Sequence, residues 1–170
     1  MLRYKPAIIF VIKFFAVYGL LTLLYSYYLS FFPEKIDPVS DFVVQLSNKS
    51  IQLFVPGVYL EYPEGYPRVN MMYEGYAYQY YIEGCSAISV MILFSSFVLS
   101  FKARAASYVW FVPAGIVVIL VTNVLRITLI GLCYLYYPQT AAFLHDFAFP
   151  AVIYGVTMLL WVVWVKYFIR

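Results

Sequence analysis

Three side chains of this sequence have the chemistry that thiol-based acyl transfer requires, although they lie far apart along the chain. Cys85 supplies a thiol, Arg126 a guanidinium group and His145 the only imidazole. A thiolate can attack a carbonyl carbon while a neighbouring histidine accepts and returns the proton. An arginine can stabilise the oxyanion of the tetrahedral intermediate. These residue types predict a cysteine nucleophile, if the fold brings them together.

The local sequence favours a functional role for Cys85 and Arg126 over packing. Arg126 interrupts the apolar stretch LVTNVLRITLIG, and a charge at a helix centre costs about 2.5–3.5 kcal/mol on membrane-insertion scales. The alternative is an arginine that anchors its helix at the membrane interface. Cys85 stands at the expected start of a helix, where free N–H groups favour a thiolate. Cys133 has no polar neighbour, and we interpret it as a packing residue.

Four more polar residues are secondary candidates because of their positions. Asn123 precedes the arginine by three residues and therefore shares its helix face. Ser86 follows the thiol directly. Glu83 and Asp146 flank the expected site, where they orient the histidine or bind a cationic acceptor, or else are exposed turn and cap residues. The histidine has a similar alternative as an interfacial cap.

The composition is that of an integral membrane protein. Of the 170 residues, 65% are hydrophobic and only 11% are charged, whereas about a quarter are charged in a typical soluble domain. One small core cannot bury this much apolar surface, so we expect the lipid bilayer around the chain and no nucleic acid as a partner. The two cysteines form no CxxC pair, so neither a zinc site nor a thioredoxin-type site is indicated.

Four apolar stretches predict four transmembrane helices, because a span needs roughly 17–25 residues and lipid leaves backbone groups no other partners. They cover about residues 7–32, 85–101, 107–137 and 147–165. The expected fold class is an all-α polytopic membrane protein, with residues 1–170 as a single membrane domain. A small outer α/β-hairpin insertion, residues 33–84, separates the first two helices.

The charge pattern predicts the orientation. Basic residues flank the spans on one side: Arg3, Lys5, Lys102, Arg104, Lys166 and Arg170. Seven of the eight acidic residues lie between Glu34 and Glu83, and the eighth is Asp146. By the positive-inside rule, both termini are cytoplasmic. Cys85, Arg126 and His145 then lie at the same outer depth, on three different helices.

The outer segment has two local patterns. Asp37-Pro38 predicts a helix start, after which Phe42, Val43 and Leu46 share a face that suits the outer leaflet. Further on, tyrosines alternate with smaller or polar residues up to Tyr80, which predicts a β-hairpin or a pair of short strands. These tyrosines can hold an incoming peptide, but tyrosine is enriched at membrane interfaces in general, and we assign most of them that role.

At these residues the chain resembles the exosortase/archaeosortase family of membrane cysteine transpeptidases, and in particular its short exosortase F type. EGCSAIS is similar to the family's Cys-Ser-Gly motif, NVLRI matches its Asn-x-x-Arg-Ile motif, and HD matches the position of its histidine. The likeness covers roughly residues 83–150. Ala87 stands where the family has glycine, and the chain is shorter than the larger members, which leaves open how a sorting motif is held.

The resemblance implies that Cys85 is the nucleophile, Arg126 the oxyanion or thiolate stabiliser and His145 the acid/base, with no metal or organic cofactor. It implies exported substrates whose C-terminal sorting signal is a short motif, a transmembrane helix and a basic tail. The cleaved protein passes to an amine acceptor, a lipid or polysaccharide, or to water. The implied location is the bacterial inner membrane, with the site facing the periplasm.

Two other functions are compatible with the sequence. A membrane thiol redox protein would pair Cys85 with Cys133 in a disulfide, which an oxidising exterior allows. A non-catalytic membrane subunit would use the outer segment as a docking surface, and it predicts that Cys85→Ala is harmless.

Overall fold

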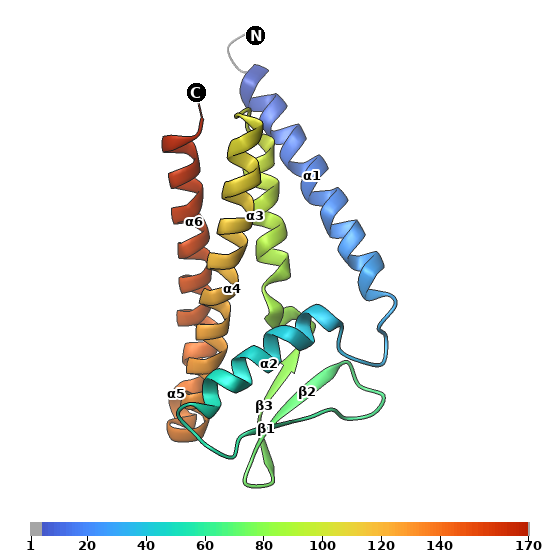
Figure 1. Cartoon of the computed structure of the whole chain (residues 1–170), viewed down its shortest axis with the longest axis vertical. Coiled ribbons are helices and arrows are strands. Elements are labelled where there is room, and N and C mark those ends of the chain that lie inside the picture. Colours follow the sequence, from blue (N-terminus) through green and yellow to red (C-terminus); the bar gives the residue numbers. More distant parts are fainter. Residues whose placement is uncertain (1–4, 170) are drawn as a thin grey trace.

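The computed structural model describes residues 5–169, in which helices form a bundle that is covered at one end by a small sheet (Figure 1). The helices are α1 (Lys5–Leu29), α2 (Pro38–Gln52), α3 (Ile88–Ser100), α4 (Ala105–Tyr136), α5 (Pro138–Phe143) and α6 (Phe149–Tyr167). The strands are β1 (Tyr59–Glu61), β2 (Arg68–Tyr73) and β3 (Tyr76–Ile82). Two of the predicted topology residues, Arg3 and Arg170, lie outside the described residues.

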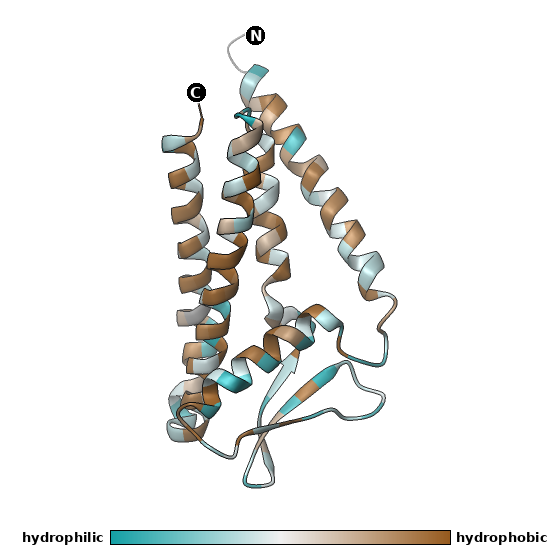
Figure 2. Ribbon diagram, viewed as in Figure 1, coloured by the Kyte–Doolittle hydropathy of each residue, from teal (hydrophilic) through white to brown (hydrophobic). Residues whose placement is uncertain are grey.

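The bundle has two unlike ends. The start of α1, the α3–α4 connection and the end of α6 lie together at one end, whereas α2 and the sheet cover the other (Figure 1). The long helices are predominantly hydrophobic along their length, and the polar residues gather in α2 and the sheet (Figure 2). This arrangement makes the chain a membrane protein with a structured segment between α1 and α3.

Three helical stretches of the described chain are long and apolar enough to cross a membrane: Lys5–Leu29, Ala105–Tyr136 and Pro138–Tyr167. The expected span at residues 85–101 is a helix of only 13 residues, α3. Its length of about 20 Å is less than the roughly 30 Å of a hydrocarbon core. The expected count of four spans is therefore not confirmed. The shortfall arises because residues before Ile88 fold as a tight turn rather than as helix.

Close packing joins α3, α4 and α6. Phe94 of α3 is fully buried, and its ring lies against Gly115 of α4. A Cβ atom added at Gly115 would come within 2.2 Å of the Phe94 ring. Trp164 of α6 completes this cluster and is also fully buried. Small residues allow close approach of helices where lipid provides no hydrophobic driving force.

Gly115→Ala is expected to destabilise the bundle by about 1–3 kcal/mol, because the new methyl group overlaps the Phe94 ring in a filled core. Gly155→Ala on α6 is the matched control, since nothing lies within 4 Å of its Cβ position. Thermal unfolding of the two variants in detergent measures the difference. Equal midpoints for both variants would show that the Phe94 ring moves aside without cost.

Helix α2 begins as predicted and faces a different way. Asp37 caps it, accepting hydrogen bonds from the Val39 and Ser40 amides, with Pro38 in the first turn. The buried face carries Ser40, Val43, Val44, Ser47, Asn48 and Ile51. The predicted face of Phe42, Val43 and Leu46 is wrong, because Val43 packs inward while the other two stay exposed. Contact with α4, not helix amphipathicity alone, decides which side is buried.

The predicted hairpin is confirmed as β2 and β3, and β1 extends it to an antiparallel sheet in the order β1-β2-β3. Glu74 and Gly75 both have positive φ, as a two-residue hairpin turn requires. Val69 and Met71 of β2 are fully buried in the same cluster as Val44 of α2. The sheet therefore shares one core with α2 and α4, which fixes the course of β3 toward Cys85.

Candidate active site

A cavity of about 250 Å³ brings Cys85, Arg126 and His145 together. The three come from three separate elements: the turn before α3, the C-terminal half of α4, and the stretch before α6. The remaining lining residues are Tyr78, Gln79, Tyr80, Ile127 and Tyr134. The fold thus places a thiol, a guanidinium and an imidazole around one space, and their chemical roles remain a prediction.

Cys85 lies in a 3₁₀ turn, Glu83–Ser86, and not in the first turn of α3, where the sequence placed it. The Asn123 side-chain amide donates a hydrogen bond of 2.8 Å to the Cys85 carbonyl. Ser86 is buried, and its hydroxyl lies 3.4 Å from the Ile88 amide. The predicted supporting residues Asn123 and Ser86 thus bond to the backbone at Cys85 and just after it.

Ala87 links this turn to α3 with a φ of 60°, in the left-handed region. An L residue there costs roughly 1–2 kcal/mol, a cost that glycine avoids. This is the position where the Cys-Ser-Gly motif has glycine, so the departure from the motif falls on the strained residue. Ala87 is also buried, so its methyl group contributes packing that partly offsets the strain.

Ala87→Gly is expected to keep processing activity and to leave stability within about 1 kcal/mol of wild type, because strain relief and the lost methyl contact nearly cancel. Ala87→Val is expected to lose activity, since a β-branched residue does not fit a buried left-handed position. Substrate cleavage and thermal unfolding of both variants check this. Full activity in Ala87→Val would contradict the backbone geometry assigned to the turn.

Asn123 is expected to position the nucleophile. Asn123→Ala removes the hydrogen bond to the Cys85 carbonyl and should slow cleavage by about 10–100-fold, because small misplacements of reacting groups carry costs of that size. Thr122→Ala is the matched control, since the Thr122 hydroxyl bonds only to its own helix at Val118. The alkylation rate of Cys85 in a Cys133→Ser background should change with Asn123→Ala alone. Equal alkylation rates in both variants would remove the positioning role.

Arg126 is partly buried in α4 and faces the cavity. Its Nε atom is buried and has no hydrogen-bond partner. A buried unpaired donor costs about 1–3 kcal/mol, more for a charged group. This favours an occupant of the cavity that accepts a hydrogen bond.

His145 lies in a π-helical turn, Leu144–Ala148, that connects α5 to α6. Pro150 explains the widened turn, because proline lacks the N–H that would bond to Asp146 and its ring crowds that carbonyl. The Nδ1 atom of His145 lies 2.9 Å from Oδ1 of Asp146. If the carboxylate accepts the Nδ1–H, Nε2 is left as the atom that can exchange a proton. Asp146 is thus the carboxylate that contacts the histidine, and its orienting role stays a prediction.

Glu83 has a different partner from the two that the sequence offered. The Tyr25 hydroxyl of α1 donates a hydrogen bond to its carboxylate. Tyr28, three residues further along α1, bonds to Asp37 at the start of α2. Glu83 therefore joins the end of α1 to the turn that carries the thiol, and Asp146, not Glu83, is the acidic residue in contact with the histidine.

Sequence reasoning missed the tyrosines and the glutamine of the cavity wall. Tyr78, Gln79 and Tyr80 are consecutive residues of β3, and Tyr134 is on α4. Burial raises the pKa of Tyr78, which therefore stays a neutral phenol. The tyrosines that alternate directly before Cys85 are the one sequence signal for this cavity wall. The same pattern is typical of residues at a membrane interface, so it does not by itself predict a binding site.

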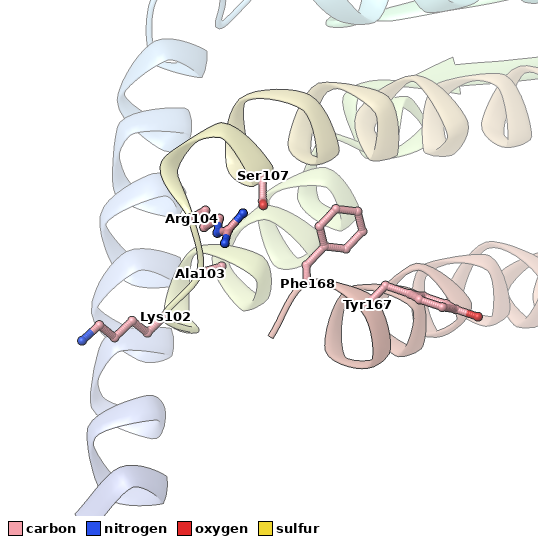
Figure 3. A pocket seen from close by; sticks show the side chains of 6 residues that line it. All are labelled: Lys102, Ala103, Arg104, Ser107, Tyr167 and Phe168. Carbon is pink, nitrogen blue, oxygen red and sulfur yellow. The ribbon is translucent and has the colours of Figure 1, made fainter. Parts of the chain in front are cut away.

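Two larger cavities lie at the opposite end of the bundle, and neither is lined by a cysteine or a histidine. One, of about 440 Å³, is lined by Lys102, Arg104, Ser107 and the end of α6 (Figure 3). Its Lys102 points away from the other lining residues (Figure 3). Cavity size therefore does not identify the site, whereas the reactive side chains do. Cys133 is a free thiol, as is Cys85, and it does not line the candidate site.

Comparison with known proteins identifies the family of this chain. A search of the curated proteins and a search of the solved structures both find no match. The sequence model of the transmembrane exosortases matches residues 6–163, nearly the whole chain, and so includes the thiol, the guanidinium and the imidazole. This chain belongs to the transmembrane exosortase family.

Proposed function

We propose that this protein is a membrane-embedded cysteine transpeptidase that cleaves the C-terminal sorting signal of exported proteins. The observation that supports it best is the shared cavity of Cys85, Arg126 and His145. Family membership adds that transmembrane exosortases act on sorting signals. The three residues also match the family's motifs in order.

The proposed reaction has two halves with one covalent intermediate. The Cys85 thiolate attacks the scissile carbonyl carbon, and the oxyanion that forms faces Arg126. The C–N bond breaks as His145 gives its proton to the leaving amine, so the membrane anchor departs and a thioester remains. An acceptor amine or water then attacks the thioester, gives its proton to His145 and releases the thiolate. No cofactor enters either half.

The substrates are proposed to be anchored in the same membrane. A short motif followed by a transmembrane helix and a basic tail would present its cleavage site near the membrane surface, at the depth of Cys85. The acceptor is proposed to be an amine on a lipid or polysaccharide, and the site is proposed to face the periplasm of the bacterial inner membrane. Both termini are then cytoplasmic, in agreement with the basic residues at that end of the bundle.

Co-expression tests the function. The candidate substrates are exported proteins of the same genome that carry a C-terminal helix and a basic tail. Each is produced with and without this protein, and its size and membrane retention are measured. We expect a smaller, anchor-free form only when this protein is present. A matched substrate that lacks the short motif should stay intact, and cleavage of both substrates alike would contradict recognition of a sorting signal.

A further inference from the structure

Strand β3 has one edge without a backbone partner. In the order β1-β2-β3, hydrogen bonds from β2 satisfy only one edge of β3. Within residues 5–169, no backbone hydrogen bond from outside the sheet reaches Tyr76–Ile82. An edge strand of this kind offers its free N–H and C=O groups to another extended chain.

The candidate active-site cavity lies along this free edge. Tyr78, Gln79 and Tyr80 line it in succession, and no residue of β1 or β2 does. Consecutive side chains of a strand point to opposite faces of the sheet. Tyr78 is the extra residue of a β-bulge, but Gln79 and Tyr80 keep the regular pairing with β2, so their side chains point to opposite faces. Contact with both Gln79 and Tyr80 therefore places the cavity beside the strand, near α4, which β3 also contacts.

The cavity wall also has unsatisfied polar atoms. The Tyr78 hydroxyl, the Gln79 Oε1 atom and the Arg126 Nε atom are buried without hydrogen-bond partners. A peptide backbone supplies both donors and acceptors, as this mixed set requires. Strand β3 ends at Ile82, three residues before Cys85. A chain paired with β3 would therefore run directly to the thiol.

We propose that β3 binds the substrate by strand addition. The extended segment beside the scissile bond pairs with Tyr78–Tyr80 as a fourth strand of the sheet, which delivers the carbonyl to Cys85. Main-chain hydrogen bonds provide the binding, and the side chains of Gln79 and Tyr80 contact substrate side chains on the two opposite faces of the extended sheet. This rests on the proposed function, because it names how the substrate of that same site is held.

Photo-cross-linking at the two edges of the sheet tests the proposal without requiring turnover. The Cys85→Ala protein carries benzoylphenylalanine in place of Tyr80 on β3 or Tyr59 on β1, both exposed edge-strand tyrosines. Each is produced with a candidate substrate that has an intact anchor. We expect adducts to the substrate segment next to its transmembrane helix from the β3 position only. Equal adducts from both edges, or none from β3, would overturn strand addition.

A proline scan of the same substrate segment adds a backbone readout. Proline removes one N–H, so cleavage should fall about tenfold at alternate positions and little at those between, because only alternate amides face β3. Alanine at the same positions controls for side-chain recognition. A uniform proline effect would overturn strand addition even with Cys85-dependent cleavage intact. If adducts form at β3 but the wild-type protein does not cleave the substrate, strand addition would be supported and the catalytic function refuted.

Discussion

Cys85→Ser is expected to abolish substrate cleavage, with a fall on the order of 10⁴-fold or more, because removing a nucleophile eliminates the covalent route. A serine hydroxyl is far less ionised than a thiol, so it is a much weaker nucleophile at this position. The substitution changes one atom of a partly buried side chain, so stability should stay close to that of wild type. The uncut substrate should accumulate in the membrane with its anchor.

Cys133→Ser is the matched control for that result. Both cysteines are free and partly buried, but only Cys85 lines the candidate site. We expect Cys133→Ser to cleave at the wild-type rate. If both variants lose activity, a redox partnership of the two thiols returns as the explanation. If neither does, the thiol is a packing residue and the catalytic reading fails.

Arg126→Gln is expected to lower the cleavage rate by about 10²–10³-fold, the usual effect of removing one oxyanion donor. Arg126→Lys should lose activity as well, because a lysine keeps the charge but not the fixed fork of donors. Neither change should unfold the protein, since a buried guanidinium is itself costly in a membrane. The measurement is the initial rate of cleavage in membranes with equal amounts of each variant.

Arg104→Gln is the control for the arginine. It makes the same substitution beside the other end of α4, in a cavity that is lined by neither cysteine nor histidine (Figure 3). We expect cleavage to stay at the wild-type rate. If Arg104→Gln and Arg126→Gln slow cleavage equally, the effect reflects membrane orientation. A wild-type rate in Arg126→Gln would make Arg126 an interfacial anchor.

Features that depend on interactions within a few residues, or on a charge in an apolar helix, were predictable from the sequence. The buried charge of Arg126 required a polar partner or a cavity, and it lines one. The cap at Asp37 and the hairpin before Cys85 follow from side chains that act within a few residues. The family match over residues 6–163 confirms the resemblance seen in the motifs.

Features that depend on contacts between distant elements were not predictable. The turn at Glu83–Ser86 forms where the sequence continues directly into an apolar run, so α3 is shorter than the run suggests. Tyr25 is the partner of Glu83 because α1 passes nearby, 58 residues away in the chain. The cavity wall formed by β3 depends on the position of α4 beside it. The periodicity of hydrophobic residues does not predict contacts between elements that are far apart in the sequence.

Hydroxylamine trapping tests the central claim most directly, namely that a thioester forms on Cys85. Membranes that contain this protein and a cleaved candidate substrate are treated with hydroxylamine, which attacks a thioester in place of the natural acceptor. Mass spectrometry should find a hydroxamate at the new C-terminus with the wild type and none with Cys85→Ser. A free carboxylate at every hydroxylamine concentration, or a hydroxamate from Cys85→Ser, would contradict an acyl-enzyme on this thiol.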